Sequence, residues 1–205
     1  MSRFDERASA WDAKPRRIKL ARDVVNSIIK YAKPEKGIDI IDFGTGTGLI
    51  ALGLVDYAKA IKGYDNSQGM LDVLANKARE AGISNLETAY IDIDKDDFES
   101  ESTDLVTCSM VAHHLDSPEV FFQKAYDALR EGGKLCVADL AYTEIPFHEE
   151  VPEGVKHEGF SREWVVEAFE NCGFSSVQFE TGAFIEKERD GKKLEFEVFL
   201  AIGVK

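Results

Sequence analysis

Short apolar runs alternate with amphipathic stretches along most of the chain. The first such run covers residues 38–43, and similar runs recur at 60–65, 86–91 and 103–110. Between them, apolar residues recur at helical spacing, as they do over residues 68–81. Strands that are apolar on both faces are typical of a parallel sheet covered by helices. The pattern therefore predicts an α/β fold with a doubly wound, mostly parallel sheet.

The two ends of the chain depart from this alternation. Residues 15–32 place apolar side chains on one helical face, with a proline in the first turn and another just beyond the end. Near the carboxyl end, alternating apolar residues from Val177 and again from Leu194 predict two strands, joined through residues 189–192. This terminal hairpin is expected to place an antiparallel strand in the sheet.

Glycines at alternate positions follow the first apolar run, in the stretch DFGTGTG at residues 42–48. Glycine permits positive φ and close approach of a ligand to the main chain, and the start of the next helix offers N–H groups. We therefore expect this turn to bind a nucleotide-like ligand. Residues 46–51 also fit the dinucleotide pattern G-x-G-x-x-G/A, which leaves a nicotinamide or flavin cofactor open.

The frame that starts at Asp42, Asp-x-Gly-x-Gly-x-Gly, resembles motif I of the class I S-adenosylmethionine-dependent methyltransferases. Residues 4–12 resemble the amino-terminal segment of the ubiquinone- and menaquinone-type enzymes in the small-molecule branch of that family. The paired glycines at 132–133 and the terminal hairpin match as well, so the resemblance covers nearly all 205 residues. It implies a Rossmann-like, doubly wound sheet of seven strands and S-adenosylmethionine as the cofactor.

The resemblance also assigns roles to residues at the ends of successive strands. It places Asp42 near the amino group of the cofactor, and Asp92 and Ile93 at its adenine. Asp65 ends the second apolar run, where a carboxylate in a doubly wound sheet can accept both ribose hydroxyls. The residues expected to bind the cofactor are Trp11, Asp42, Gly44, Thr45, Gly46, Gly48, Asp65, Asn66, Met70, Asp92, Ile93 and Ser109.

Simpler structural explanations stay open for several of these residues. Asp65 could cap the next helix, although Ser67 can do so instead. Phe4 and Trp11 could only fasten the terminus to the surface, rather than cover the cofactor. Asp92 opens an acid-rich run, in which any one carboxylate could be a solvated loop charge.

His113 and His114 follow the fourth apolar run, whose end faces the transferable methyl group in the resembled fold. DNA enzymes that methylate amino groups carry Asn/Asp-Pro-Pro-aromatic there, whereas residues 109–112 read SMVA, which disfavours such a substrate. Either histidine is a candidate general base, and a structural or cofactor-shielding role is the alternative. Adjacent side chains splay apart and no third ligand is evident, so a metal site is not expected.

Two further segments are expected to border the site within a single domain spanning residues 1–205. Residues 1–36 are expected to form helices that cover the cofactor. Residues 141–160 break the periodicity and mix aromatic side chains with glutamates. Irregular segments of this length usually carry function, so we expect a substrate lid there.

Composition narrows the class of partner. The formal net charge of −13 would repel a phosphate backbone, so a small-molecule acceptor is expected and a nucleic acid is not. Neither a membrane-spanning tract of about 20 apolar residues nor a secretory signal is evident, which predicts no membrane insertion and a cytoplasmic location. Cys108, Cys136 and Cys172 are widely spaced and are expected to be buried, reduced thiols. The oligomeric state is not predicted.

We therefore expect methyl transfer from S-adenosylmethionine to a small molecule by direct displacement. The cofactor is already activated, so the protein mainly aligns the reactants and excludes water. Two alternatives stay open. One is an NAD-dependent oxidoreductase that uses the 46–51 frame, although no Tyr-x-x-x-Lys constellation accompanies it. The other is a non-catalytic S-adenosylmethionine-binding protein on the same fold.

Overall fold

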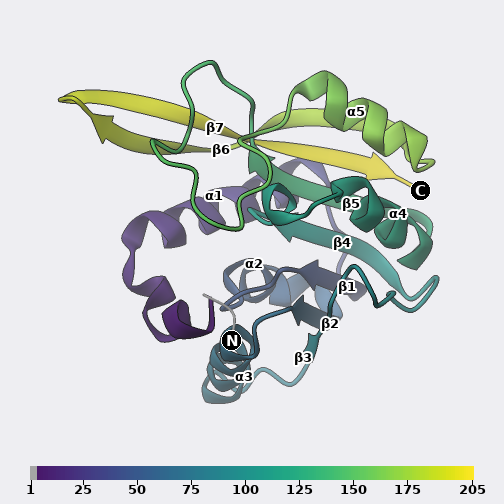
Figure 1. The fold of residues 1–205 in the computed structure, drawn as a ribbon. Coiled ribbons are helices and arrows are strands. Elements are labelled where there is room, and N and C mark those ends of the chain that lie inside the picture. The colour runs from purple at the N-terminus through teal and green to yellow at the C-terminus, as the bar shows by residue number, and fades with distance from the viewer. Residues whose placement is uncertain (1–3) are drawn as a thin grey trace.

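A computed structural model describes residues 4–205 and contains one seven-stranded sheet (Figure 1). Its strands are β1 (Ile38–Phe43), β2 (Ala58–Asp65), β3 (Leu86–Tyr90), β4 (Thr103–Ser109), β5 (Leu129–Leu140), β6 (Ser175–Arg189) and β7 (Lys192–Val204). They lie in the order β3-β2-β1-β4-β5-β7-β6. The first five run parallel, whereas β7 is antiparallel to both of its neighbours. The predicted doubly wound sheet with an antiparallel strand from the terminal hairpin is confirmed.

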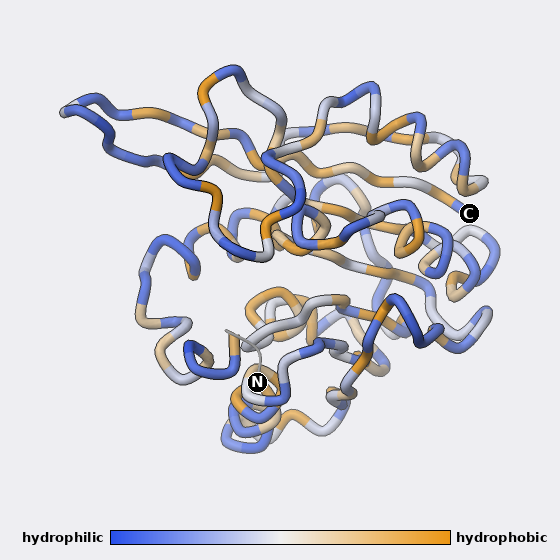
Figure 2. Tube along the Cα trace, in the orientation of Figure 1, coloured by the Kyte–Doolittle hydropathy of each residue, from blue (hydrophilic) through white to orange (hydrophobic). Residues whose placement is uncertain are grey.

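Helices cover both faces of this sheet. They are η1 (Asp5–Ala13), α1 (Pro15–Tyr31), α2 (Leu49–Leu54), η2 (Val55–Tyr57), α3 (Gln68–Glu80), η3 (Ala112–His114), α4 (Pro118–Ala128) and α5 (Arg162–Asn171), where η denotes a 3₁₀-helix. One hydrophobic cluster joins α1, α2 and α3 to one face, and a second joins α4 and α5 to the other. Figure 2 shows hydrophobic residues along the central strands, while the projecting tip of the β6–β7 hairpin is mostly hydrophilic.

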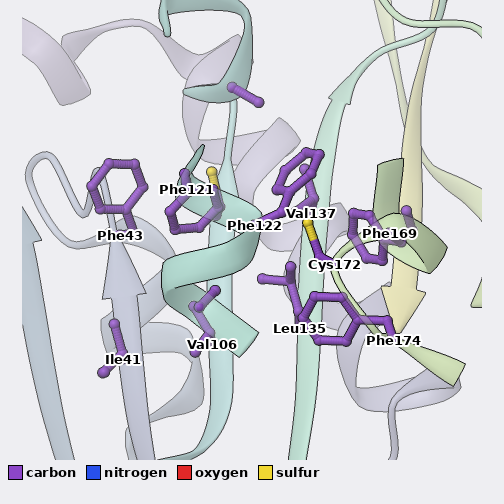
Figure 3. Close-up of a cluster of buried hydrophobic side chains, with 14 of the residues drawn as sticks. Ile41, Phe43, Val106, Phe121, Phe122, Leu135, Val137, Phe169, Cys172 and Phe174 are labelled. Carbon is purple, nitrogen blue, oxygen red and sulfur yellow. The ribbon is translucent and has the colours of Figure 1, made fainter. Parts of the chain in front are cut away.

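Aromatic packing under α4 fixes the strand that leads into the glycine turn. Phe43, the last residue of β1, stacks on Phe121 with ring centroids 4.4 Å apart, and Phe122 meets Phe169 of α5 at 4.9 Å (Figure 3). Each buried phenylalanine contributes about 1.5–3 kcal/mol relative to an exposed one. The start of the turn is therefore held by the core rather than by the loop itself.

The boundaries of one strand differ from the prediction. The sequence predicts a turn at residues 132–133 before a strand over 135–140, but β5 begins at Leu129. Leu129 pairs with Thr103 before the register shifts, so the pairing with β4 extends back past the two glycines. Gly132 still adopts a positive φ of 77°, which gives the local bend.

Residues 141–160 are irregular, as predicted, apart from a bridge between Ala141 and Phe160 that closes the base of the loop. In Figure 1 this green loop lies beside the β6–β7 hairpin, and the two are joined by hydrogen bonds from Arg189 to the carbonyl oxygens of Pro146 and Phe147. In the described part of the chain, no helix has the length and apolar character that a membrane crossing requires.

The three cysteines are buried, as predicted. Burial raises the pKa of Cys136 to about 12 and raises that of Cys108 well above its ordinary value. Both thiols therefore stay protonated near neutral pH, and they serve as small apolar side chains in the core.

Candidate functional site

The three glycines of the turn after β1 have different tasks. A Cβ on Gly44 would lie 2.3 Å from Cγ2 of Val111, and one on Gly48 would lie 2.1 Å from Cδ1 of Leu74. Both positions are thus closed by packing. Gly46 has a φ of 54°, and a Cβ there would meet nothing closer than the carbonyl oxygen of Gly44 at 4.0 Å. Gly46 is therefore the position at which a ligand can approach the main chain.

A cavity of about 480 Å³ opens in front of this turn. Small-molecule sites commonly have volumes of about 300–1,000 Å³. It lies where the carboxyl ends of β1, β2 and β4 meet, at the point where the strand order reverses. The predicted residues that line it are Trp11, Gly44, Thr45, Gly46, Asp65, Asn66, Met70, Asp92, Ile93, Ser109, His113 and His114. Asp42 and Gly48 do not line it.

Asp65 ends β2 at the cavity wall and organises the turn beside it. Its Oδ2 accepts the Gly46 N–H at 2.8 Å, and its Oδ1 accepts the Ser67 N–H at 2.9 Å. The side chain that caps α3 belongs to Ser67, whose hydroxyl accepts the Met70 N–H. Burial raises the pKa of Asp65, and the hydrogen bonds from Gly46 and Ser67 oppose that rise. A carboxylate offers about four acceptor positions, so a ribose diol can add to these bonds.

Asp42 lies beneath the turn instead of facing the cavity. It is 1% exposed, and its two oxygens accept the hydroxyls of Thr45 and Thr107, each at 2.7 Å. The carboxylate thus joins the turn to β4. The structure places it among these hydroxyls, and its contact with the cofactor's amino group stays a prediction. Burial raises the pKa of Asp42 to about 6, against the opposing effect of the two hydroxyls.

Asp42→Asn is expected to change how stability depends on pH. Because the folded-state pKa of about 6 exceeds the ordinary aspartate value of 3.8, the ionised carboxylate disfavours folding once the pH rises between these values. The difference corresponds to about 3 kcal/mol. Urea unfolding at a series of pH values should show the wild-type free energy of unfolding falling by about this amount relative to Asp42→Asn between about pH 4 and about pH 7.

A matched variant tests the cause of this effect. Thr107→Val keeps the shape of the side chain but removes one hydroxyl that donates to Asp42. With one donor fewer, the folded-state pKa of Asp42 should rise further, so the decline in stability should extend to higher pH and become larger. If the free energies of unfolding of the wild type and of Asp42→Asn changed in parallel with pH, the raised pKa of Asp42 would be contradicted.

Asp92 and Ile93 follow β3 at the far wall of the cavity. Ile93 is buried there, 8% exposed, as an apolar wall requires. Asp92 accepts a hydrogen bond from Nζ of Lys95 at 2.5 Å, and this bond lowers the pKa of Asp92. An adenine amino group at this position would therefore share the carboxylate with Lys95.

Two acids fasten η1 across the opening of the site, and sequence reasoning missed both. Oδ1 of Asp5 accepts the Gly69 N–H of α3 at 3.0 Å. Asp12 accepts the hydroxyl of Thr47 in the glycine turn at 2.7 Å and forms an ion pair with Lys77. Only tertiary contact distinguishes these acids from other surface carboxylates, because no motif marks them. Residues 1–3 of the predicted covering segment lie outside the described residues.

Trp11 lies at the cavity and is also fastened to its own segment. Its ring lines the cavity and packs edge-on against Phe4, with centroids 5.8 Å apart. Its other contact is the guanidinium of Arg17, which lies 3.5 Å from the ring centroid and also donates to the Trp11 carbonyl oxygen. Such a stacked cation holds the indole in place. Trp11 therefore fastens the segment and also forms part of the cavity wall.

The two histidines have different partners. Nδ1 of His113 lies 2.7 Å from Oδ1 of Asp139, and the His113 N–H donates to Oδ2 of the same carboxylate at 3.2 Å. His113 and Asp139 are 5% and 0% exposed. His114 instead places Nδ1 2.6 Å from the carbonyl oxygen of Gly154 in the loop. Sequence reasoning missed Asp139. Its position near the end of the apolar run of β5, the strand beside β4, could have indicated a role at the site.

The loop of residues 141–160 is held against this histidine segment. The carbonyl oxygen of His113 accepts the N–H groups of Lys156 and His157 at 2.9 and 3.1 Å. Phe147, His148, Pro152 and Val155 of the loop line the cavity. Across residues 4–205, no group of three or more His, Cys, Asp or Glu side chains is arranged to hold a metal ion.

Comparisons with known proteins agree with this geometry. A family model described as a methyltransferase domain matches residues 41–137. An uncharacterized methyltransferase of Schizosaccharomyces pombe is 35% identical over 158 residues, which is 70% of this chain and 56% of that protein. A ubiquinone biosynthesis O-methyltransferase of Coxiella burnetii is 24% identical over 138 residues, 66% of this chain and 58% of that protein. The chain thus spans little more than half the length of these relatives.

A solved structure shows the same fold over the whole chain. The Haloferax volcanii complex between the Trm112 methyltransferase activator and a putative methyltransferase matches with a TM-score of 0.81 and 19% identity. The match covers 100% of this chain and 98% of that one. The architecture inferred from the strand order and the hairpin is thus shared by a protein of very different sequence.

Proposed function

Because the chain belongs to the class I S-adenosylmethionine-dependent methyltransferases, we propose that it transfers a methyl group from S-adenosylmethionine to a small molecule. The observation that carries the proposal is one cavity lined by the open face of Gly46, the carboxylate of Asp65 and His113, whose ring pairs with the buried Asp139. When bound, S-adenosylmethionine supplies an electrophilic methyl group on a sulfonium whose leaving group is a neutral thioether. The residues of this chain then need only bind the cofactor and the acceptor, orient them, and exclude water.

The residues on the β1–β3 side of the cavity suit the cofactor. Gly46 gives access to the main chain, and Asp65 offers charged acceptors for a diol. Ile93 and Met70 supply apolar walls for a ring. The segment fastened by Asp12 would cover this end, and the loop of residues 141–160 would cover the other, as two lids of one domain.

His113 is suited to accept the proton that an O–H or N–H acceptor loses on methylation. Asp139 orients the imidazole through Nδ1 and stabilises its protonated form, as carboxylates do for catalytic histidines elsewhere. His114 has another task, since it joins the loop through Gly154. We therefore assign the general base to His113 and a positioning role to Asp139.

Ligand titration separates this proposal from the two alternatives. Calorimetry should show S-adenosylhomocysteine binding at micromolar or tighter affinity and NADH binding at least about tenfold more weakly. A preference for NADH would instead support an oxidoreductase that uses residues 46–51. Production of S-adenosylhomocysteine from S-adenosylmethionine in the presence of a small-molecule acceptor, followed by mass spectrometry, would exclude a non-catalytic binding protein. If no member of a broad panel of acceptors were methylated, the alternative of a non-catalytic S-adenosylmethionine-binding protein would be favoured.

A further inference from the structure

The two ends of the cavity carry opposite charge. Asp65, Asp92 and Asp94 line the end beneath β2 and β3. Arg16, near the start of α1, lines the end toward β6, close to Lys187 and Arg189 of that strand. The order of the strands sets β3 and β6 at opposite edges of the sheet, and α1 packs against β6. In a chain with a formal net charge of −13, a group of cations at one end of one cavity is a local feature and not an effect of composition.

The hairpin places Lys187 beside Arg16, next to residues that line the cavity. Lys187 of β6 lies 3.4 Å from the ring centroid of Phe147 and donates to the carbonyl oxygen of that residue at 2.5 Å. Burial, followed by the charges of Arg189 and Arg16, lowers the pKa of Lys187. Arg16 and Lys187 are thus close enough to repel each other although they come from opposite ends of the chain. Among residues 4–205, neither forms an ion pair with a carboxylate.

An unsatisfied polar atom lies in the same place. Nδ1 of His148 is buried and has no hydrogen-bond partner among the described residues, while the side chain lines the cavity. Burial, followed by the charges of Lys187 and His113, lowers the pKa of His148, so the ring is neutral near pH 7. A buried polar atom without a partner is unfavourable, and a ligand that bonded to it would remove that penalty.

We propose, on the basis of the methyl transfer proposed above, that the acceptor carries an anionic group, a carboxylate or a phosphate, which binds between Arg16 and Lys187 with His148 as a hydrogen-bond partner. Arginine and lysine recognise both anions through charge-assisted bonds. Phe147 and Ile185 give this end apolar walls, so the remainder of the acceptor is apolar or aromatic. The cavity then holds the cationic methyl donor at its acidic end and the anionic acceptor at its basic end.

Calorimetry on protein saturated with S-adenosylhomocysteine tests this assignment with three probes. Benzoate and phenyl phosphate represent the two anions, and benzamide is the neutral match for benzoate. At least one anion should bind about tenfold or more tightly than benzamide, and its affinity should fall as salt is added. The stronger of the two anions identifies the acceptor's group. Equal binding of benzoate, phenyl phosphate and benzamide would overturn the proposal.

Variants locate the site. Arg16→Gln and Lys187→Gln should each weaken the anion about tenfold and change the affinity for S-adenosylhomocysteine by less than about twofold. Lys187→Arg should restore binding, which excludes simple misfolding of the hairpin. Arg22→Gln is the matched control, because Arg22 lies on the same helix, outside the cavity lining, and faces Asp23.

The variants also separate this inference from the proposed function. If S-adenosylhomocysteine failed to bind the wild type, the methyl-transfer proposal itself would fail. If it bound but Arg16→Gln weakened it as much as the anion, the cations would serve the cofactor and the anionic acceptor would be wrong.

Discussion

Asp65→Ala should weaken the binding of S-adenosylhomocysteine by about 100-fold or more in a calorimetric titration. The variant loses the charged acceptors for a ribose diol, and hydrogen bonds to charged groups contribute about 1.5–3 kcal/mol each. It also leaves the N–H groups of Gly46 and Ser67 without their acceptor, so the turn loses its fixed shape. Both effects act on the same binding step and in the same direction.

Two further variants make the Asp65 result specific. Asp65→Asn keeps one carbonyl oxygen for the Gly46 N–H, and its loss of affinity should fall between those of the wild type and the alanine variant. Asp72→Ala, on the exposed side of α3, removes the same charge outside the cavity lining and should bind normally. If Asp65→Ala bound within about threefold of the wild type, Asp65 would serve only to shape the turn.

Asp139→Asn should lower turnover by about 100-fold while the affinity for S-adenosylhomocysteine stays near that of the wild type. The amide keeps an oxygen for neighbouring N–H groups but removes the negative charge that favours the protonated His113 ring. The rate would be followed as S-adenosylhomocysteine formed with an acceptor identified by screening. Retained cofactor binding would show that the cavity still folds.

The pH–rate profile separates a positioning role from a merely structural one. Without the carboxylate, His113 should lose its proton more readily, so the rise of the rate with pH should move to lower pH in Asp139→Asn. His113→Gln should remove that rise altogether. Asp127→Asn on α4, whose carboxylate accepts a hydrogen bond from Gln123 on the exposed surface, is the control. A profile that kept its position in Asp139→Asn would rule out an effect through the imidazole.

The sequence was informative where chemistry follows directly from position along a strand. Asp65 could be predicted because an acid that ends an apolar run of a parallel sheet must reach the carboxyl edge, where ligands bind. Gly46 was predicted together with Gly44 and Gly48, from the alternating glycines after the first apolar run. The antiparallel strand of the sheet could be predicted too, because the terminal hairpin distinguishes this fold from ordinary dinucleotide-binding domains.

Side-chain direction limited the prediction for Asp42. It also stands near the carboxyl end of a strand, but its register partner on β4 is Thr107, and the carboxylate is buried between two hydroxyls. The sequence shows the acid but not the direction of its side chain. Asp139 was missed for a related reason, because its role depends on the contact of β5 with the segment that follows β4.

The remaining omissions arise from contacts between distant segments. The chain separates Asp12 from Lys77 by 65 positions and Lys187 from Phe147 by 40, and no local pattern links the members of either pair. The loop of residues 141–160 was predicted to be irregular, yet its support by two hairpin cations depends on how far β6 extends beyond the sheet.

The hydrogen bond from the Gly69 N–H to Asp5 makes the hydrogen exchange of this amide a measure of how the amino-terminal segment moves. Amides in the first turn of a helix have no partner within the helix, so they normally exchange with solvent quickly. The Gly69 amide is covered only while η1 lies against α3. Its hydrogen–deuterium exchange rate therefore reports how often the amino-terminal segment lifts, and comparison with the ligand's dissociation rate would show whether that lifting limits release.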